Sequence, residues 1–170
     1  MAGAIITARM DGEAARRAFF RLAMRMGDTT PIMGAIGTGL VEGTNDRARR
    51  AVDPDGQSWA PLMPAYAAIK RGPGILRASG ELMDSITRRA GPTSVEVGTN
   101  RIYGGVHQHG ATIKPVTAKR LVFRLAGGMV AAASVTIPAR PFLGISAEDE
   151  RMILDTLEDA LDRALATGRK

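Results

Sequence analysis

Apolar residues recur every three to four positions in three stretches of the chain, which predicts three amphipathic helices. The stretches are residues 11–26, residues 30 to about 50, and the segment that follows Ser146. Their apolar positions are Ala15, Ala18, Phe19, Leu22 and Met26, then Ile32, Ile36 and Leu40, and finally Ile153, Leu157, Ala160, Leu161 and Ala164. Two helices are therefore expected near the N-terminus and one at the C-terminus.

Residues at the expected helix ends support this assignment. Thr30 is followed by proline, which is typical of an N-cap with proline in the first turn. Ser146 and Asp149 fit a capping box loosely at the start of the last helix. The interior of the second helix contains Gly34, Gly37, Gly39 and Gly43. Because each glycine costs about 1 kcal/mol relative to alanine, we expect this helix to pack closely on a neighbouring element or subunit, with Gly37 and Gly39 as candidate contacts.

Elsewhere the chain contains short segments typical of strands, and Val135 and Ile137 alternate with Ser134 and Thr136 at the period of a half-buried strand. We expect strands at residues 4–8, 85–89, 94–97, 120–125 and 129–137. The glycines at 127 and 128 predict a turn that joins the last two strands into a long hairpin. We expect turns with Trp59 as an anchor over residues 53–62, a short helical piece over 64–70, a short helix or loop over 101–109, and a mobile loop over 112–119.

This order of helices, strands and a final helix predicts an α+β fold with an antiparallel sheet. The chain has 170 residues, which fits a single domain spanning residues 1–170. Residues 1–52 form its N-terminal helical part, and residues 53–170 form an α+β core that ends in the C-terminal helix. We find no internal repeat.

The composition excludes several classes of chemistry. The chain has no cysteine, so it has no disulfides, thiolate metal sites or thiol nucleophiles, which suits a reducing cytoplasm. Aromatic residues make up 4% of the chain, so stacking platforms for nucleic-acid bases are not expected. No apolar run is long enough to span a membrane, and the first residues lack a signal-peptide pattern. We expect a soluble protein without membrane contact.

Charge is divided unevenly along the chain, whose net charge is +6. Residues 97–147 contain no acid, whereas the final 23 residues carry seven acids and four bases. The bases of the acid-free stretch are Arg101, Lys114, Lys119, Arg120, Arg124 and Arg140. Surfaces of opposite sign allow either a contact within the molecule or a head-to-tail contact between copies. Separate solvated faces remain an equally good interpretation.

No motif predicts catalysis or a bound cofactor. His107 and His109 would share a face on a strand, but a third metal ligand is missing nearby. Residues 53–56 resemble a calcium loop only faintly, and the glycines near Gly37 lack the strand and lysine of a nucleotide loop. The acids of the last helix form an outer face with nothing to raise a carboxyl pKa. We therefore expect no catalytic, cofactor or metal residues, and no enzyme.

Three segments resemble the phage virion morphogenesis and tail-completion proteins of Mu-like phages and prophages. The first contains Asp55-Gly56 and Trp59-Ala60-Pro61-Leu62, with Lys70 downstream. The second contains Ser79-Gly80-Glu81-Leu82 and Ser85-Ile86. The third contains Val97-Gly98-Thr99, Tyr103 and Val106-His107-Gln108, and ends in Pro138-Ala139-Arg140-Pro141-Phe142-Leu143-Gly144. They occur in the family's order and cover about residues 53–165.

The resemblance implies a structural virion protein that completes the tail or joins head to tail at the neck. It would act as a hexamer-like ring of identical subunits, assembled in the bacterial host cytoplasm, beside other neck, connector and tail proteins. Candidate interface residues are Trp59, Arg140, Phe142, Leu143, Gly37 and Gly39, although Arg140, Phe142 and Leu143 fit an internal core equally well. Candidate residues facing a DNA channel are Lys114, Lys119, Arg120 and Arg124. Alternatives are a tail terminator or assembly factor absent from the mature particle, and a basic nucleic-acid-binding module.

Overall fold

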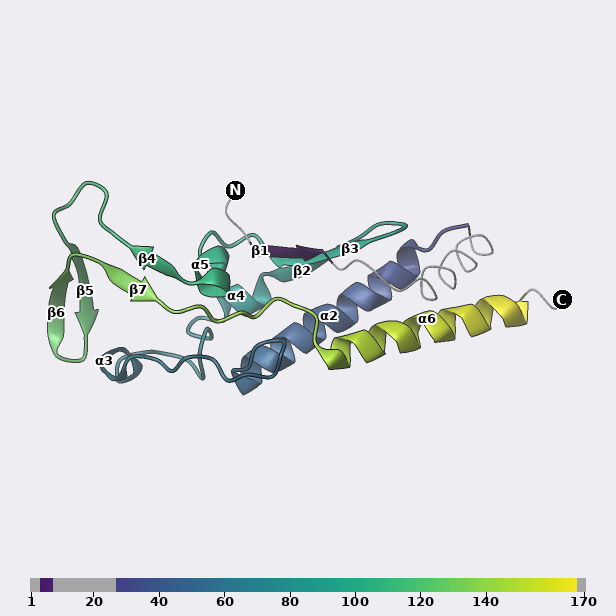
Figure 1. Cartoon of the computed structure of the whole chain (residues 1–170), viewed down its shortest axis with the longest axis horizontal. Helices are drawn as coiled ribbons and strands as arrows, with labels where there is room; N and C mark the ends of the chain where they lie inside the picture. Colours follow the sequence, from purple (N-terminus) through teal and green to yellow (C-terminus); the bar gives the residue numbers. More distant parts are fainter. Residues whose placement is uncertain (1–3, 8–26, 168–170) are drawn as a thin grey trace.

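The computed structural model describes residues 4–7 and 27–167 of the chain (Figure 1). The strands are β1 (Ala4–Thr7), β2 (Ile86–Ala90), β3 (Val95–Thr99), β4 (Ala111–Ile113), β5 (Leu121–Leu125), β6 (Gly128–Ala132) and β7 (Val135–Ile137). The helices are α2 (Thr30–Arg50), α3 (Pro64–Ala67), α4 (Glu81–Asp84), α5 (Gly104–His109) and α6 (Ala147–Thr167). The fold is α+β with antiparallel pairing, as predicted. The helix expected over residues 11–26 lies outside the described residues.

The long helix α2 begins one residue away from the expected cap. Its N-cap is Thr29, so the prediction that Thr30 is the N-cap was wrong. The backbone N–H of Thr30 instead donates to Oδ1 of Asp28 at 2.9 Å, which provides the acceptor that a capping side chain would supply. The hydroxyl of Thr29 donates to the carbonyl of Pro92 and ties the start of α2 to the turn between β2 and β3.

The three-stranded sheet has the order β1-β3-β2, with antiparallel neighbours throughout. Alternate residues of β3 are buried, namely Val95, Val97 and Thr99, and α2 packs against β2 and β3. Leu40 of α2 and Val97 are among the least exposed side chains of the core. The alternating burial along β3 reflects one face packed on a helix and one face turned away from it.

Residues 111–137 form two further ribbons, β4 with β7 and β5 with β6, that project away from the long helices (Figure 1). We call residues 111–137 the arm. The predicted strand over residues 129–137 is divided into β6 and β7 by a bend at Ala133. The loop expected over residues 112–119 begins inside β4, which pairs with β7 through Thr112 and Thr136. Neither correction could come from local patterning, because β4 is held by a distant strand.

The short helices account for the remaining differences. α3 ends at Ala67, three residues before the expected end at Lys70. α4 was not predicted, since its four residues are too few to display a helical period. Residues 101–109, for which the sequence allowed either a short helix or a loop, contain α5, whose last residues are Gln108 and His109.

Candidate functional site

Segments far apart in the sequence meet around residues 138–144. Arg140 is 5% exposed, its Nε donates to the carbonyl of Ala60 at 2.8 Å, and its Nη2 donates to the carbonyl of Pro61 at 2.9 Å. The indole Nε1 of Trp59 donates to the carbonyl of Pro141 at 2.8 Å. Charged and ring donors therefore bind the loop before α3 to the segment before α6.

Gln108 of α5 holds the same segment from another element. Its Oε1 accepts from the backbone N–H groups of Phe142 at 3.1 Å and Leu143 at 3.0 Å, and its Nε2 donates to the carbonyl of Leu143 at 2.8 Å. The backbone N–H of Arg140 donates to the carbonyl of His107 at 2.7 Å. We call these contacts of residues 59–61 and 107–108 with residues 138–144 the clamp. It joins the first and the third of the segments that carry the family resemblance.

The clamp holds four of the candidate interface residues inside the core of their own chain. Trp59 and Arg140 are buried, and Phe142 and Leu143 are 0% and 2% exposed. They pack within their own chain, which is the alternative that the sequence left open. Another chain could contact Phe142 only if residues 138–144 moved out of the core. Contact with another copy through these residues stays a prediction that one chain does not test.

Gly37 and Gly39 allow two close approaches within the chain. A Cβ at Gly37 would lie 2.6 Å from Cγ2 of Val95 in the sheet, and one at Gly39 would lie 2.6 Å from Sδ of Met152 in α6. A Cβ at Gly43 would lie 2.4 Å from Oδ1 of Asp149. The glycines of α2 therefore allow the sheet to pack closely on one side of this helix and α6 to pack closely on another side.

A buried ion pair joins α2 to α6. Nη1 of Arg47 lies 2.5 Å from Oδ2 of Asp149, and the two side chains are 3% and 4% exposed. Asp149 also accepts from the backbone N–H of Ser146 at 2.9 Å, while Oγ of Ser146 accepts from the N–H of Asp149 at 3.1 Å. The predicted capping box is thus confirmed. Sequence reasoning missed Arg47, because nothing local marks a basic residue whose partner comes from another helix.

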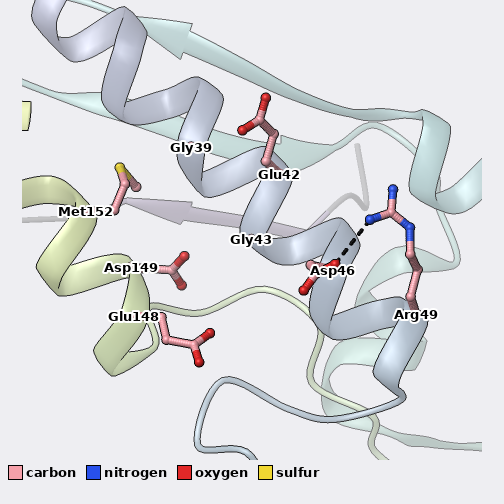
Figure 2. Close-up of a pocket in the computed structure, with 8 residues that line it drawn as sticks. All are labelled: Gly39, Glu42, Gly43, Asp46, Arg49, Glu148, Asp149 and Met152. Atoms are coloured by element: carbon pink, nitrogen blue, oxygen red, sulfur yellow. Dashed lines mark hydrogen bonds and ion pairs between the residues drawn. The ribbon is translucent and has the colours of Figure 1, made fainter.

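Beside this ion pair, residues of α2 and α6 line an open groove with a volume of ≈ 490 Å³. Figure 2 shows its lining: Gly39, Glu42, Gly43, Asp46, Arg49, Glu148, Asp149 and Met152. Arg49 contacts Asp46 at 3.2 Å, and Arg50 contacts Glu148 at 3.4 Å. Four carboxylates and the guanidinium of Arg49 line the groove, and Arg47 and Arg50 beside it pair with Asp149 and Glu148, which leaves an excess of one acid.

His107 is half-buried, and its Nδ1 is buried and has no hydrogen-bond partner among the described residues. Burial, followed by the nearby charge of Arg140, lowers the pKa of His107 below its usual value of 6.5. Burial also lowers the pKa of Arg140. The two histidines lie on a helix, where residues two apart do not share a face. Within residues 4–7 and 27–167, no three His, Asp or Glu side chains are grouped to hold a metal ion.

The four candidate channel residues lie together on the arm. Lys114, Lys119, Arg120 and Arg124 are all exposed. Among the described residues, no carboxylate lies within ion-pair distance of any of them. The arm is therefore a basic surface, separated from the acidic groove and from the acids of α6.

The described part of the chain thus has a clamped core, a basic arm and a helix rich in acids. A sequence model of the phage virion morphogenesis family matches residues 10–162, and the chain belongs to this family. It is 29% identical over 132 residues to the "Putative capsid assembly protein G" of Escherichia phage Mu. The aligned residues make up 74% of this chain and 75% of that protein. No solved structure matches the chain significantly. In the described part of the chain, no helix is long and apolar enough to cross a bilayer.

Proposed function

We propose that this chain is a structural protein of a tailed phage or prophage particle that completes the tail and joins it to the head at the neck. It acts as a ring of identical copies rather than as an enzyme. Membership of the virion morphogenesis family supports the particle role, and the relative in phage Mu supports a role in assembly.

The observation that carries the proposal is the separation of opposite charges along the molecule. The basic arm projects at one end, and α6 runs toward the other end (Figure 1). A ring requires two different complementary surfaces on every subunit, and a head-to-tail contact that closes generates it. The chain offers both surfaces.

A ring at the neck surrounds the path of the DNA. The arm then presents some of Lys114, Lys119, Arg120 and Arg124 to the channel, where positive charge counters the phosphate backbone. This role needs no base-specific contact, which suits a chain with few aromatic residues.

The test is deletion of the gene from the phage or prophage that carries it, followed by electron microscopy of the lysate. We expect DNA-filled heads and separate tails, with infectivity restored when the gene is supplied on a plasmid. Complete and infectious particles without the protein would refute the proposal.

A second candidate is an assembly factor or tail terminator that is absent from the finished particle. The word "assembly" in the name of the phage Mu relative favours it. Mass spectrometry of purified virions separates the two, because a neck component remains in the particle and an assembly factor does not.

A further inference from the structure

Within the part of the chain that the structure describes, the β5–β6 ribbon has one exposed face. The register pairs Val122 with Ala131 and Arg124 with Met129, so these four side chains share one face. Val122 is 63% exposed and Met129 is 69% exposed, whereas the opposite face has Leu121, Phe123 and Leu125 half-buried. We call Val122, Arg124, Met129 and Ala131 the outer hairpin face. Arg120 lies in the bend directly before β5 and adds a second exposed base beside the hairpin.

Helix α6 presents a matching face of opposite charge. Its apolar side, which includes Leu157, Ala160 and Ala164, belongs to the core cluster. Turned away from that side are Leu154, Asp155, Glu158, Asp162 and Leu165, which we call the outer helix face. Leu154 and Leu165 are 49% and 43% exposed, and among the described residues no base lies within ion-pair distance of the three acids.

The two faces cannot meet within one chain. The hairpin stands at the end of the arm, and α6 extends in the opposite direction from the middle of the molecule (Figure 1). The outer hairpin face combines exposed apolar side chains with positive charge. The outer helix face combines exposed leucines with three acids, which outnumber the exposed Arg151 on the same side of the helix. A contact between them therefore joins two copies through different surfaces, which is the arrangement that closes into a ring.

We propose that the outer hairpin face of one copy docks on the outer helix face of the next copy. Arg120 and Arg124 pair with the acids of α6, and Val122 and Met129 cover its exposed leucines. This inference rests on the proposed function in one respect, namely that copies of the chain act together. It assigns the hairpin arginines to the subunit contact and leaves Lys114 and Lys119 for the channel.

Charge reversal tests the contact in the purified full-length protein. We expect Arg120→Glu with Arg124→Glu to weaken self-association by more than about tenfold in sedimentation velocity, because like charges then face each other. Glu158→Lys with Asp162→Lys should do the same. Mixing the two variants should restore association, since each then offers a face that complements the other. Arg71→Glu, on an exposed loop, is the control for changed net charge.

Cysteine crosslinking tests the same contact inside particles, against a background free of native cysteine. We expect the double variant Met129→Cys with Leu154→Cys to give a ladder of linked copies with a short bismaleimide. Each single variant should give none, because unlike surfaces meet. Circular dichroism and the Tm confirm that the variants fold.

Three results would overturn the inference: reversals that leave association unchanged, a mixture that does not recover, or folded double-cysteine protein that gives no ladder in particles. Linked dimers from a single-cysteine variant would also overturn it. The proposed function fails separately, if deletion of the gene leaves complete particles.

Discussion

At the scale of single residues, the pair Arg47 and Asp149 tests how α2 and α6 are held together. Both side chains are buried, so removing one partner leaves an uncompensated charge away from water. We expect Asp149→Ala to lower the free energy of unfolding by about 3–5 kcal/mol in urea titrations. Asp46→Ala removes an exposed pair with Arg49 and should change it by less than about 1 kcal/mol. Equal effects would show that burial of the pair does not matter.

His107 predicts a pH dependence of stability. Its pKa is lowered in the folded chain from 6.5, so the unfolded state binds more protons as the pH falls below that value. The stability contribution of the neutral imidazole is fully present above pH 6.5 and is lost as the pH falls through the folded pKa. We expect His107→Gln to flatten the dependence of unfolding free energy on pH between about 5 and 7.

The control for that measurement is His109→Gln, on the exposed side of the same helix. It removes an imidazole of the same helix that is not buried, and so controls for the substitution itself. A profile that is equally steep after His107→Gln would show that other groups cause it.

Sequence reasoning at this scale succeeded where partners are close along the chain. The reciprocal bonds of Ser146 and Asp149 follow from a spacing of three residues. Arg47 was missed, because its partner lies 102 residues away. For Phe142 the residue type indicated burial, but whether a hydrophobic side chain fills its own core or a neighbour's pocket is decided by the path of the chain.

At the scale of elements, α5 is connected to residues 138–144 largely through Gln108. Gln108→Met keeps the length of the side chain but leaves the backbone N–H groups of Phe142 and Leu143 without their acceptor. We expect a loss of about 2–4 kcal/mol in unfolding free energy, from unsatisfied buried donors. Gln57→Met, at an exposed turn, is the matched control and should be near neutral. Equal losses from both variants would contradict a role of the clamp in stability.

The arm predicts an unusual tolerance to truncation. No residue from 111 to 139 is buried, so the arm adds little to the core. Replacing residues 120–133 with a short Gly/Ser linker should shift the Tm by no more than about 3 °C, measured by circular dichroism. Leu40→Ala, at a side chain 1% exposed, should cost about 2–5 kcal/mol and lower the Tm far more. A large fall on truncation would place the hairpin in the folding core.

Elements whose apolar residues recur at a clear spacing were predictable from the sequence, and elements held by partners far away in the chain were not. α2, α6, β2 and β3 show the apolar spacing of one face packed on the core. β4 has three residues and pairs with β7, so its own sequence carries no strand signal. In place of the predicted single sheet there are three, one of β1, β3 and β2 and two ribbons, and the bend at Ala133 lies where the chain passes from one ribbon to the other.

At the scale of the whole molecule, the lysines of the arm test the proposed DNA channel. Lys114 and Lys119 are exposed and lie outside the outer hairpin face. Reversing both to glutamate should lower the infectious titre while leaving self-association unchanged, because negative charge would then face the phosphates. Plaque counts and sedimentation measure the two effects. Normal titre with normal association would remove these lysines from the channel.

The division of charge along the molecule was visible in the sequence, but its geometry was not. An acid-free stretch followed by an acidic helix allowed an internal contact as well as a contact between copies. The fold separates the arm from α6 (Figure 1), and the apolar side chains of both faces, including Val122, Met129 and Leu154, are exposed. Complementary surfaces that cannot satisfy each other within one chain are the physical basis of the proposed ring.

The most direct test of this account is cryo-electron microscopy of the head–tail junction in mature particles of the phage that carries the gene. The account predicts a ring of density at the junction into which copies of this chain fit, with the arm of each copy on α6 of the next. A junction complete without density for this chain would contradict it.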